Sequence, residues 1–149
     1  MAVIIKKLTN RDVDCFLDLL NVFKNVFEWV SRTPDPLYLK KILDNKQFLV
    51  FIAIMDNVVV GGLTAYILDR YDSEKPAAYI YDIAVISERQ RNGIGKDLIA
   101  TLNDYCKENN FSEAFVQAEM EDTQAISFYR GTPVSSELQA LHFTYSFDN

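Results

Sequence analysis

The fold is decided by the stretch AAYIYDIAVISERQRNGIGKDLIATLNDYC, residues 77–106. Residues 77–86 are mostly β-branched, aromatic and small apolar, which predicts a strand. From Ile94 to Cys106 the apolar residues recur at helical spacing. The basic turn between them, ERQRNGIGK at residues 88–96, contains two glycines. We therefore predict a strand, a basic turn and a helix in succession.

The rest of the chain follows the same two periodicities, that of a strand and that of a helix. In chain order we predict an additional strand at residues 2–8 and helices over 13–29 and 37–45. Two strands within 47–68, joined by a turn at Asp56 and Asn57, precede the strand, turn and helix of residues 77–106. After these we predict a strand over 112–120, a short helix over 122–130 capped by Asp122 or Thr123, and a final alternating strand over 140–147. Gly61 and Gly62 indicate a bulge in the second hairpin strand. We expect one α/β domain over residues 1–149, because this length suits a single hydrophobic core.

The composition is that of a water-soluble globular protein, with 49% hydrophobic and 24% charged residues. No apolar run is long enough to cross a bilayer, and residues 1–10 lack the apolar core of a signal peptide, so we expect a cytoplasmic protein. Acidic residues outnumber basic ones by 21 to 15, a net charge of −6. This balance argues against nucleic acid as the main partner. It is compatible with a cationic ligand and equally with surface solubility alone.

The two cysteines, Cys15 and Cys106, lack the spacing of metal ligands, so we expect reduced core thiols and no metal site. Cys106 lies on the apolar stripe of its predicted helix, which argues against a nucleophilic role. His142 is the only histidine and lies in the final predicted strand. We expect it to have a structural or substrate-lining role.

The basic turn is suited to bind a phosphate group. A helix N-terminus presents unpaired backbone N–H groups and partial positive charge, and glycines let the backbone close on an anion. Residues 90–95 have the spacing Gln-x-x-Gly-x-Gly, with Arg91 and Lys96 as countercharges. Neither the Walker motif nor the full G-x-G-x-x-G dinucleotide pattern is present. Taken alone, the turn equally describes an ordinary helix start.

Together with the preceding DIAVI (residues 82–86), the turn resembles the acyl-CoA signature of the GNAT superfamily of N-acyltransferases, Gln/Arg-x-x-Gly-x-Gly/Ala. The resemblance implies an α/β fold with a central, mostly antiparallel mixed sheet flanked by helices. It also implies acetyl-CoA as acetyl donor, with the pyrophosphate of coenzyme A at the turn and the pantetheine arm along the strand. The implied cofactor-binding residues are Ile83, Ala84 and Val85 on the strand and Gln90, Arg91, Asn92, Gly93, Ile94, Gly95 and Lys96 in the turn.

The segment DTQAISFYR (residues 122–130) resembles the family's short helix that ends in a tyrosine. The resemblance assigns Tyr129 to protonation of the departing thiolate, a role that suits a phenol at neutral pH. Without the turn, a tyrosine packing a short amphipathic helix would be the better interpretation. The RGTPV that follows departs from the family's usual ending, so the resemblance assigns no contacts beyond Tyr129.

Three stretches, two of which overlap the segments quoted above, resemble the class I aminoglycoside 3-N-acetyltransferases of this superfamily: YIYDIAV, VQAEMEDTQAISFY and LHF. This resemblance spans most of the chain. It implies acetyl transfer to the 3-amino group of the deoxystreptamine ring of an aminoglycoside. It also suggests a homodimer, which the aromatic C-terminal strand could help to build.

Carboxylates near the predicted cofactor segments fit a polycationic acceptor. Asp82 lies on the strand before the turn, and Glu119, Glu121 and Asp122 lie where a strand gives way to a helix. Asp122 and Glu121 are equally well explained as a helix cap and a solvated first-turn residue. The amine must lose a proton to attack the thioester, and we take Asp82 as the first candidate base and Glu119 as the second. Strand alternation sets Asp82 opposite Ile83 but leaves open which face lines the cleft.

Two alternatives remain. The first is an acetyltransferase for another amine, such as a polyamine, a peptide N-terminus or a lysine. The second is a module that binds acyl-CoA without catalysis, against which Tyr129 and the carboxylates argue.

Overall fold

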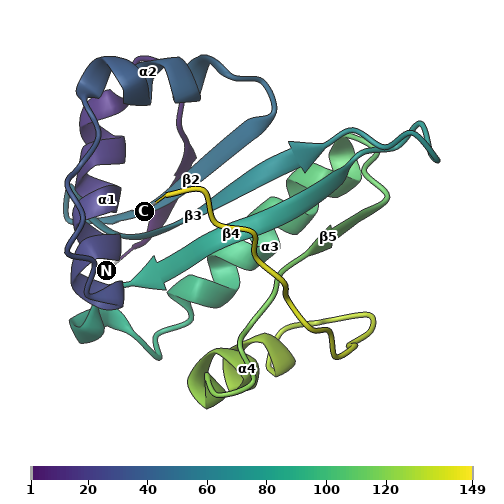
Figure 1. The fold of residues 1–149 in the computed structure, drawn as a ribbon. Helices are drawn as coiled ribbons and strands as arrows, with labels where there is room; N and C mark the ends of the chain where they lie inside the picture. Colours follow the sequence, from purple (N-terminus) through teal and green to yellow (C-terminus); the bar gives the residue numbers. More distant parts are fainter. Residues whose placement is uncertain (1, 149) are drawn as a thin grey trace. The chain divides into compact units, whose positions relative to one another are not determined.

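The computed structural model describes residues 2–148 and consists of two compact units, Met1–Gln117 and Ala118–Asn149 (Figure 1). We describe each unit by itself. The first contains a five-stranded sheet with three α-helices, and the second contains one α-helix and an irregular C-terminal segment. Within residues 2–148, no helix is both long and apolar enough to cross a membrane.

The sheet of the first unit is mixed and mostly antiparallel, as the sequence predicts. Its strands lie in the order β1 (Ile4–Lys7), β2 (Phe48–Met55), β3 (Val58–Leu68), β4 (Ala77–Val85) and β5 (Glu113–Phe115). The first four strands pair antiparallel, and β5 pairs parallel to β4. The additional strand expected at residues 2–8 is confirmed as β1.

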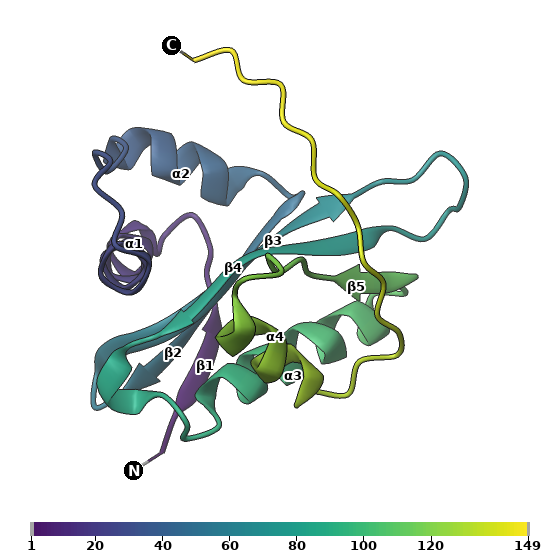
Figure 2. The ribbon, with the colours of Figure 1, turned by 60° about the horizontal axis from the view of Figure 1, so that its bottom comes forward.

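Helices cover both faces of this sheet (Figure 2). Helices α1 (Val13–Phe27) and α2 (Pro36–Asp44) lie on one face and α3 (Ile94–Glu108) on the other, with the short 3-10 helix η1 (Ser87–Arg89) before α3. The apolar stripe of α1 buries Phe16, Leu19 and Phe23 against the sheet, and that of α3 buries Leu98 and Leu102. The predicted strand, turn and helix of residues 77–106 are confirmed.

The hairpin of β2 and β3 has a tight turn at one end and a close contact with α1 at Gly62. Asp56 and Asn57 have positive φ angles of 53° and 63°, the left-handed conformation that a tight hairpin turn requires. The register of β2 and β3 shifts between Gly61 and Val59, so the bulge predicted at the glycines lies beside Gly61. A Cβ atom on Gly62 would approach Leu19 Cδ1 to 2.5 Å, so this glycine lets α1 lie close to β3.

Helix α1 ends two residues earlier than the predicted Trp29. Glu28 adopts the left-handed conformation (φ 56°), and the Trp29 N–H donates to the Lys24 carbonyl at 3.0 Å. This closure is the Schellman motif, which usually has glycine where Glu28 stands. It turns Trp29 off the helix and starts the loop to α2.

The second unit contains α4 (Thr123–Arg130), which confirms the predicted short helix. Asp122 is its N-cap and accepts the Ala125 N–H at 3.0 Å. After the helix, Arg130 forms a two-pronged ion pair with Glu137, at 2.7 and 2.9 Å.

Of the two strand predictions in the C-terminal third, one was confirmed only in part and the other was wrong. The strand predicted over 112–120 is limited to β5, residues 113–115, and the strand predicted over 140–147 is absent from the described part of that segment. An alternating pattern shows which side chains a strand could bury, but a strand also needs an edge with which to pair. The described residues of the second unit contain no strand to supply that edge.

Candidate functional site

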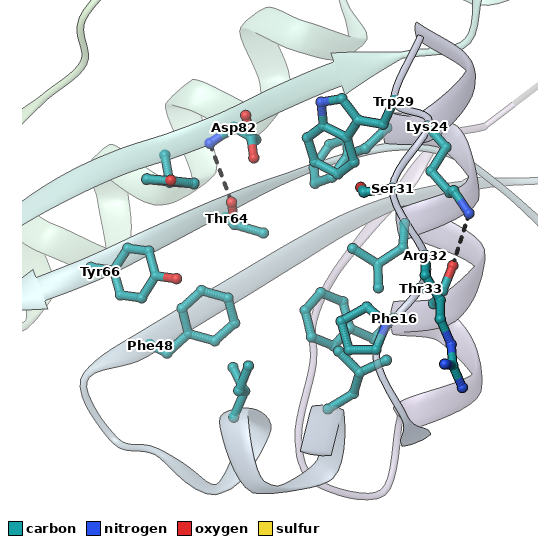
Figure 3. Close-up of a pocket in the computed structure, with 16 residues that line it drawn as sticks. Phe16, Lys24, Trp29, Ser31, Arg32, Thr33, Phe48, Thr64, Tyr66 and Asp82 are labelled. Atoms are coloured by element: carbon teal, nitrogen blue, oxygen red, sulfur yellow. Dashed lines mark hydrogen bonds between the residues drawn. The ribbon is translucent and has the colours of Figure 1, made fainter. Parts of the chain in front are cut away.

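The first unit has a cavity of about 270 Å³ on the face covered by α1 and α2 (Figure 3). We call it the aromatic pocket, because rings of Trp29, Phe48, Tyr66 and Tyr81 contribute to its lining. Helices α1 and α2, the loop between them, and strands β2, β3 and β4 all supply side chains. Asp82 is the only carboxylate among its lining residues.

A bulge in β4 directs Asp82 into this pocket. Ala65 pairs with Ile80 while the adjacent Thr64 pairs with Asp82, so Tyr81 is an extra residue on β4. Successive side chains of a regular strand point to opposite faces, but a bulge can set two on one face. Tyr81 and Asp82 accordingly both line the pocket. This settles which face of the strand Asp82 occupies.

The backbone of the bulge is held by a buried side chain. The Asp82 N–H donates to the Thr64 Oγ1 atom at 3.2 Å, and Thr64 is only 5% exposed (Figure 3). An unpaired N–H at this depth would cost about 1–3 kcal/mol. The threonine hydroxyl therefore stabilises the backbone geometry that aims Asp82 at the cavity.

The Asp82 carboxyl group is half-buried, and this burial raises its pKa above the usual value. It forms no ion pair with any of the described residues. A carboxylate that is partly desolvated and lacks a cationic partner attracts an ammonium group, and it binds a proton more readily than an exposed aspartate does. The site can therefore hold an amine and accept its proton.

Aromatic rings form a continuous wall beside Asp82. Tyr66 contacts Phe48 and Tyr81, with ring centroids 5.0 and 5.4 Å apart. Burial first, and then the neighbouring Tyr81, Tyr38 and Asp82, raise the pKa of the Tyr66 phenol, which keeps it a hydrogen-bond donor. Rings of this kind attract cations to their faces and bury the apolar surface of a ligand.

The loop over the pocket is anchored to α1. The Lys24 ammonium group donates to Thr33 Oγ1 at 3.0 Å, as Figure 3 shows. This bond ties the segment after Trp29 to the helix and directs the lysine charge to the loop. The pocket lining therefore combines the negative Asp82 and the positive Lys24 and Arg32 with apolar and aromatic side chains.

The basic turn has the geometry expected of a phosphate site. Gly93 is the N-cap of α3 with φ 82°, and no side chain caps this helix in the part of the chain that the structure describes. A Cβ atom on Gly93 would meet nothing within 4 Å. The turn is thus open at Gly93, and the exposed Arg91 and Lys96 are nearby in the chain. These residues fit an anionic group such as a pyrophosphate.

The Gln90 side chain makes a contact within the protein that the sequence does not predict. Its Nε2 atom donates to the Val85 carbonyl at 2.8 Å, so the side chain joins the turn to the end of β4. Its assignment to the cofactor stays a prediction, and the structure adds this bond within the protein.

The edge of β4 next to the turn is open within the first unit. β5 pairs with β4 only as far as Tyr79, which leaves the strand from Ile80 to Val85 without a partner there among residues 2–117. The N–H groups of Asp82 and Ile86 point toward β3. By alternation, those of Ile83 and Val85 point to the open edge, whereas Ala84 faces β3 and packs in the core. Of the three residues predicted to pair with pantetheine, two present their N–H groups to this edge.

The remaining predicted site residues belong to the second unit. Glu119 and Glu121 are exposed, and Asp122 caps α4 with one carboxylate oxygen, as the alternative interpretation of this residue anticipates. Tyr129 lies in the last turn of α4, and its carbonyl accepts the Thr132 hydroxyl at 2.6 Å. His142 lies in the irregular segment rather than in a strand. The catalytic and substrate-binding roles of these residues stay predictions.

Cys106 lies on the buried face of α3, as its position on the apolar stripe predicts. Burial raises the pKa of its thiol to about 11. The thiol is therefore protonated at neutral pH, which argues against a nucleophilic role.

Sequence reasoning missed the aromatic wall. The sequence pattern predicts Trp29 as the last residue of a helix and Tyr66 and Tyr81 as ordinary strand residues. Nothing in the pattern identifies Thr64 as the partner of a bulge. The consecutive Tyr81 and Asp82 were the one available signal, because a polar residue that breaks an apolar strand pattern often marks a bulge or a site.

Comparison with known proteins places the chain among acetyltransferases. The model of the Acetyltransferase (GNAT) family matches residues 14–131. An aminoglycoside acetyltransferase, meta-AAC0020 from an uncultured soil metagenomic sample, is 44% identical, with a TM-score of 0.96 over 98% of this chain and 97% of its own. That enzyme has been solved in complex with trehalose and with sisomicin.

A second soil-metagenome aminoglycoside acetyltransferase, HMB0005, is 29% identical, with a TM-score of 0.87 over 98% of this chain and 100% of its own. Comparison with curated proteins gave no significant match. The family model covers most of the chain. The chain is therefore an acetyltransferase of the GNAT family, with the α/β fold of that family.

Proposed function

We propose that this chain transfers the acetyl group of acetyl-CoA to an amine of an aminoglycoside, and specifically to the 3-amino group of the deoxystreptamine ring. The observation that carries the proposal is the position of Asp82, a half-buried carboxylate with a raised pKa in an aromatic pocket. Within residues 2–117, the same strand has an open edge from Ile83 to Val85. At about 3.3 Å per residue, an amine at Asp82 and a thioester arm on that edge would lie within about 10 Å of each other.

The choice of acceptor is supported by charge and by similarity. The chain has a net charge of −6, and Glu119 and Glu121 add exposed carboxylates close to α4. Such charges attract polycations and orient their ammonium groups. The 44% identical meta-AAC0020 is an aminoglycoside acetyltransferase that has been solved with sisomicin. The 3-amino position rests on the sequence resemblance alone.

Each group of the chain has a distinct task in the proposed reaction. Acetyl-CoA supplies a thioester carbon that an amine can attack. The N–H groups of the basic turn hold the pyrophosphate, and Arg91 and Lys96 offset its charge. Asp82 accepts the proton that the ammonium group loses, directly or through water, so that the nitrogen lone pair is available. Glu119 is the second candidate for this base.

The carbon–sulfur bond breaks as the carbon–nitrogen bond of the amide forms. In this proposal Tyr129 donates its phenolic proton to the departing thiolate, following the sequence resemblance. The amine nitrogen loses two protons in all: the first returns to solvent through Asp82, and the second, lost as the amide forms, restores the phenolic proton of Tyr129 through solvent. The products are the acetylated amine and free coenzyme A.

We further propose a cytoplasmic homodimer built with the C-terminal segment. Five large apolar side chains there are at least 78% exposed: Leu138, Leu141, Phe143, Tyr145 and Phe147. A row of this size on a soluble enzyme indicates an interface. Light scattering of the purified chain should give twice the monomer mass, and a truncation after Glu137 should give the monomer mass. A monomer in both cases would contradict this proposal.

The catalytic proposal is tested by thiol release from acetyl-CoA with a panel of amines. We expect turnover with sisomicin and other deoxystreptamine aminoglycosides, and acetylation at the 3-amino nitrogen when the product is examined by NMR. Turnover only with a polyamine, a peptide N-terminus or lysine would replace the aminoglycoside with that acceptor. Coenzyme A binding by calorimetry without turnover of any amine would favour the non-catalytic module.

A further inference from the structure

We propose that Trp29 is the residue by which the aromatic pocket selects amines carried on a saturated ring over linear amines. This inference rests on the proposed acetyltransferase function and adds to it a specificity-determining side chain. Trp29 lines the same cavity as Asp82, and Figure 3 shows the ring of the first and the carboxyl group of the second at this cavity.

The backbone fixes where Trp29 stands. The left-handed Glu28 and the bond from the Trp29 N–H to the Lys24 carbonyl set the direction in which the chain leaves α1. Beyond Trp29, the bond between Lys24 and Thr33 holds the loop on its other side. Lys24 therefore holds the chain on both sides of the tryptophan, through its carbonyl at Trp29 and through its ammonium group at Thr33.

The ring of Trp29 is braced but not covered. It meets Phe23 edge-on at a centroid distance of 5.9 Å and lies against Phe27 at 5.5 Å. It is nevertheless 39% exposed. A braced ring with a free part loses little conformational freedom when a ligand covers it, so it is suited to contact a ligand.

The pocket can accommodate one ring bearing one ammonium group. Its volume of about 270 Å³ lies below the roughly 300–1,000 Å³ of pockets that enclose a whole drug-sized ligand. Asp82 is the one carboxylate in its lining and can pair with one ammonium group. The cations of the lining are Lys24, which is bonded to Thr33, and Arg32. The remainder of a multi-ring aminoglycoside would lie outside the pocket.

A saturated ring suits these walls better than a flexible chain does. Its carbon-bound face covers apolar aromatic surface on Trp29 and Tyr81, while its ammonium group is attracted to both the rings and Asp82. A linear polyamine offers the same charge, but binding must immobilise several of its rotatable bonds. The pocket should therefore favour an aminocyclitol or amino sugar.

Trp29 is the only tryptophan in the sequence, so intrinsic fluorescence reports on this position directly. The full chain is titrated with sisomicin, with 2-deoxystreptamine and with spermidine, while calorimetry measures the binding of each amine independently. We expect a saturable change in Trp29 emission with both ring amines, at lower concentration than with spermidine. Binding of a ring amine by calorimetry without any change in emission would overturn the inference.

Kinetics supply the second readout. Trp29→Leu keeps an apolar side chain against Phe23 and should raise the KM for ring amines roughly tenfold, with kcat and the KM for acetyl-CoA within about twofold. Trp29→Phe should retain most of the selectivity. Tyr71→Leu is the matched control, since Tyr71 is 103% exposed and lies on the loop between β3 and β4.

The outcomes separate this inference from the function on which it rests. An equal loss for ring amines and spermidine in Trp29→Leu would contradict ring selection and leave the acetyltransferase intact. Absence of thiol release from the unmodified chain with every amine would contradict the proposed function alone, because the fluorescence titration still decides whether Trp29 contacts ring amines. Melting curves of each variant establish that it is folded.

Discussion

The basic turn and the aromatic pocket bind their proposed ligands in different ways. The turn is local, since residues 88–96 contain it entirely, and it offers mainly backbone N–H groups at the start of α3. The pocket is assembled from two helices, a loop and three strands, and it offers side chains. A site made of backbone depends on spacing and glycine, whereas a site made of side chains depends on the whole fold. Substitutions in the two regions should therefore affect different ligands.

The largest effect is expected from Gly93→Asp in the turn. The new carboxylate would stand at the proposed phosphate position, and the residue must keep a φ of 82°. We expect affinity for coenzyme A, measured by calorimetry, to fall at least roughly 100-fold. Aminoglycoside binding should change little.

Gly93→Asn is the matched control, because it has nearly the same shape and tolerates the left-handed backbone without adding charge. It should lose much less affinity than the aspartate variant. Unchanged coenzyme A affinity in Gly93→Asp would remove the turn from the cofactor site.

Asp82→Asn should have the next largest effect, this time in the pocket. The amide has the same shape but can neither accept the amine's proton nor pair with its charge. We expect kcat/KM for the aminoglycoside to fall about 100-fold, at the lower end of the range for a general base. The affinity for acetyl-CoA should be retained. A loss of less than threefold would move the role of base to Glu119, and Glu119→Gln then becomes the decisive variant.

Tyr129→Phe tests a residue of the second unit. A thiol has a pKa of about 8.5 and departs readily as thiolate, so protonation assists it only modestly. We expect kcat to fall about tenfold with unchanged affinity for acetyl-CoA. Wild-type turnover in this variant would show that the thiolate leaves without the phenol.

Thr64→Val should have the smallest effect and tests how the pocket is built. It leaves the Asp82 N–H without its partner in a buried position, and we expect urea unfolding to show a loss of about 1 kcal/mol in stability. Activity should fall only a few-fold, through the KM of the amine. Thr64→Ser keeps the hydroxyl and should retain the bond, so it should lose less stability than Thr64→Val. Equal losses in the two variants would contradict a stabilising role for this hydrogen bond.

The same contrast explains what could be predicted from the sequence. The predictions that held depend on local patterns: the apolar stripes of α1 and α3, the left-handed turn at Asp56 and Asn57, and the cap at Asp122. The predictions that failed depend on partners distant in the chain. The strand predicted over 140–147 is absent, and the described part of the second unit offers no strand edge with which it could pair. The early end of α1 is a local exception, set by the left-handed Glu28.

The sequence by itself determined the order of the elements, the position of the basic turn and the family resemblance, because spacing and periodicity act within a few residues. Only the tertiary structure decided that Asp82 faces the pocket and that Trp29, Tyr66 and Tyr81 surround it. The physical reason is that one extra residue in β4 changes the face on which a side chain lies. Thr64, whose hydroxyl stabilises this bulge, lies on the neighbouring strand β3, so the two meet only when β3 and β4 pair.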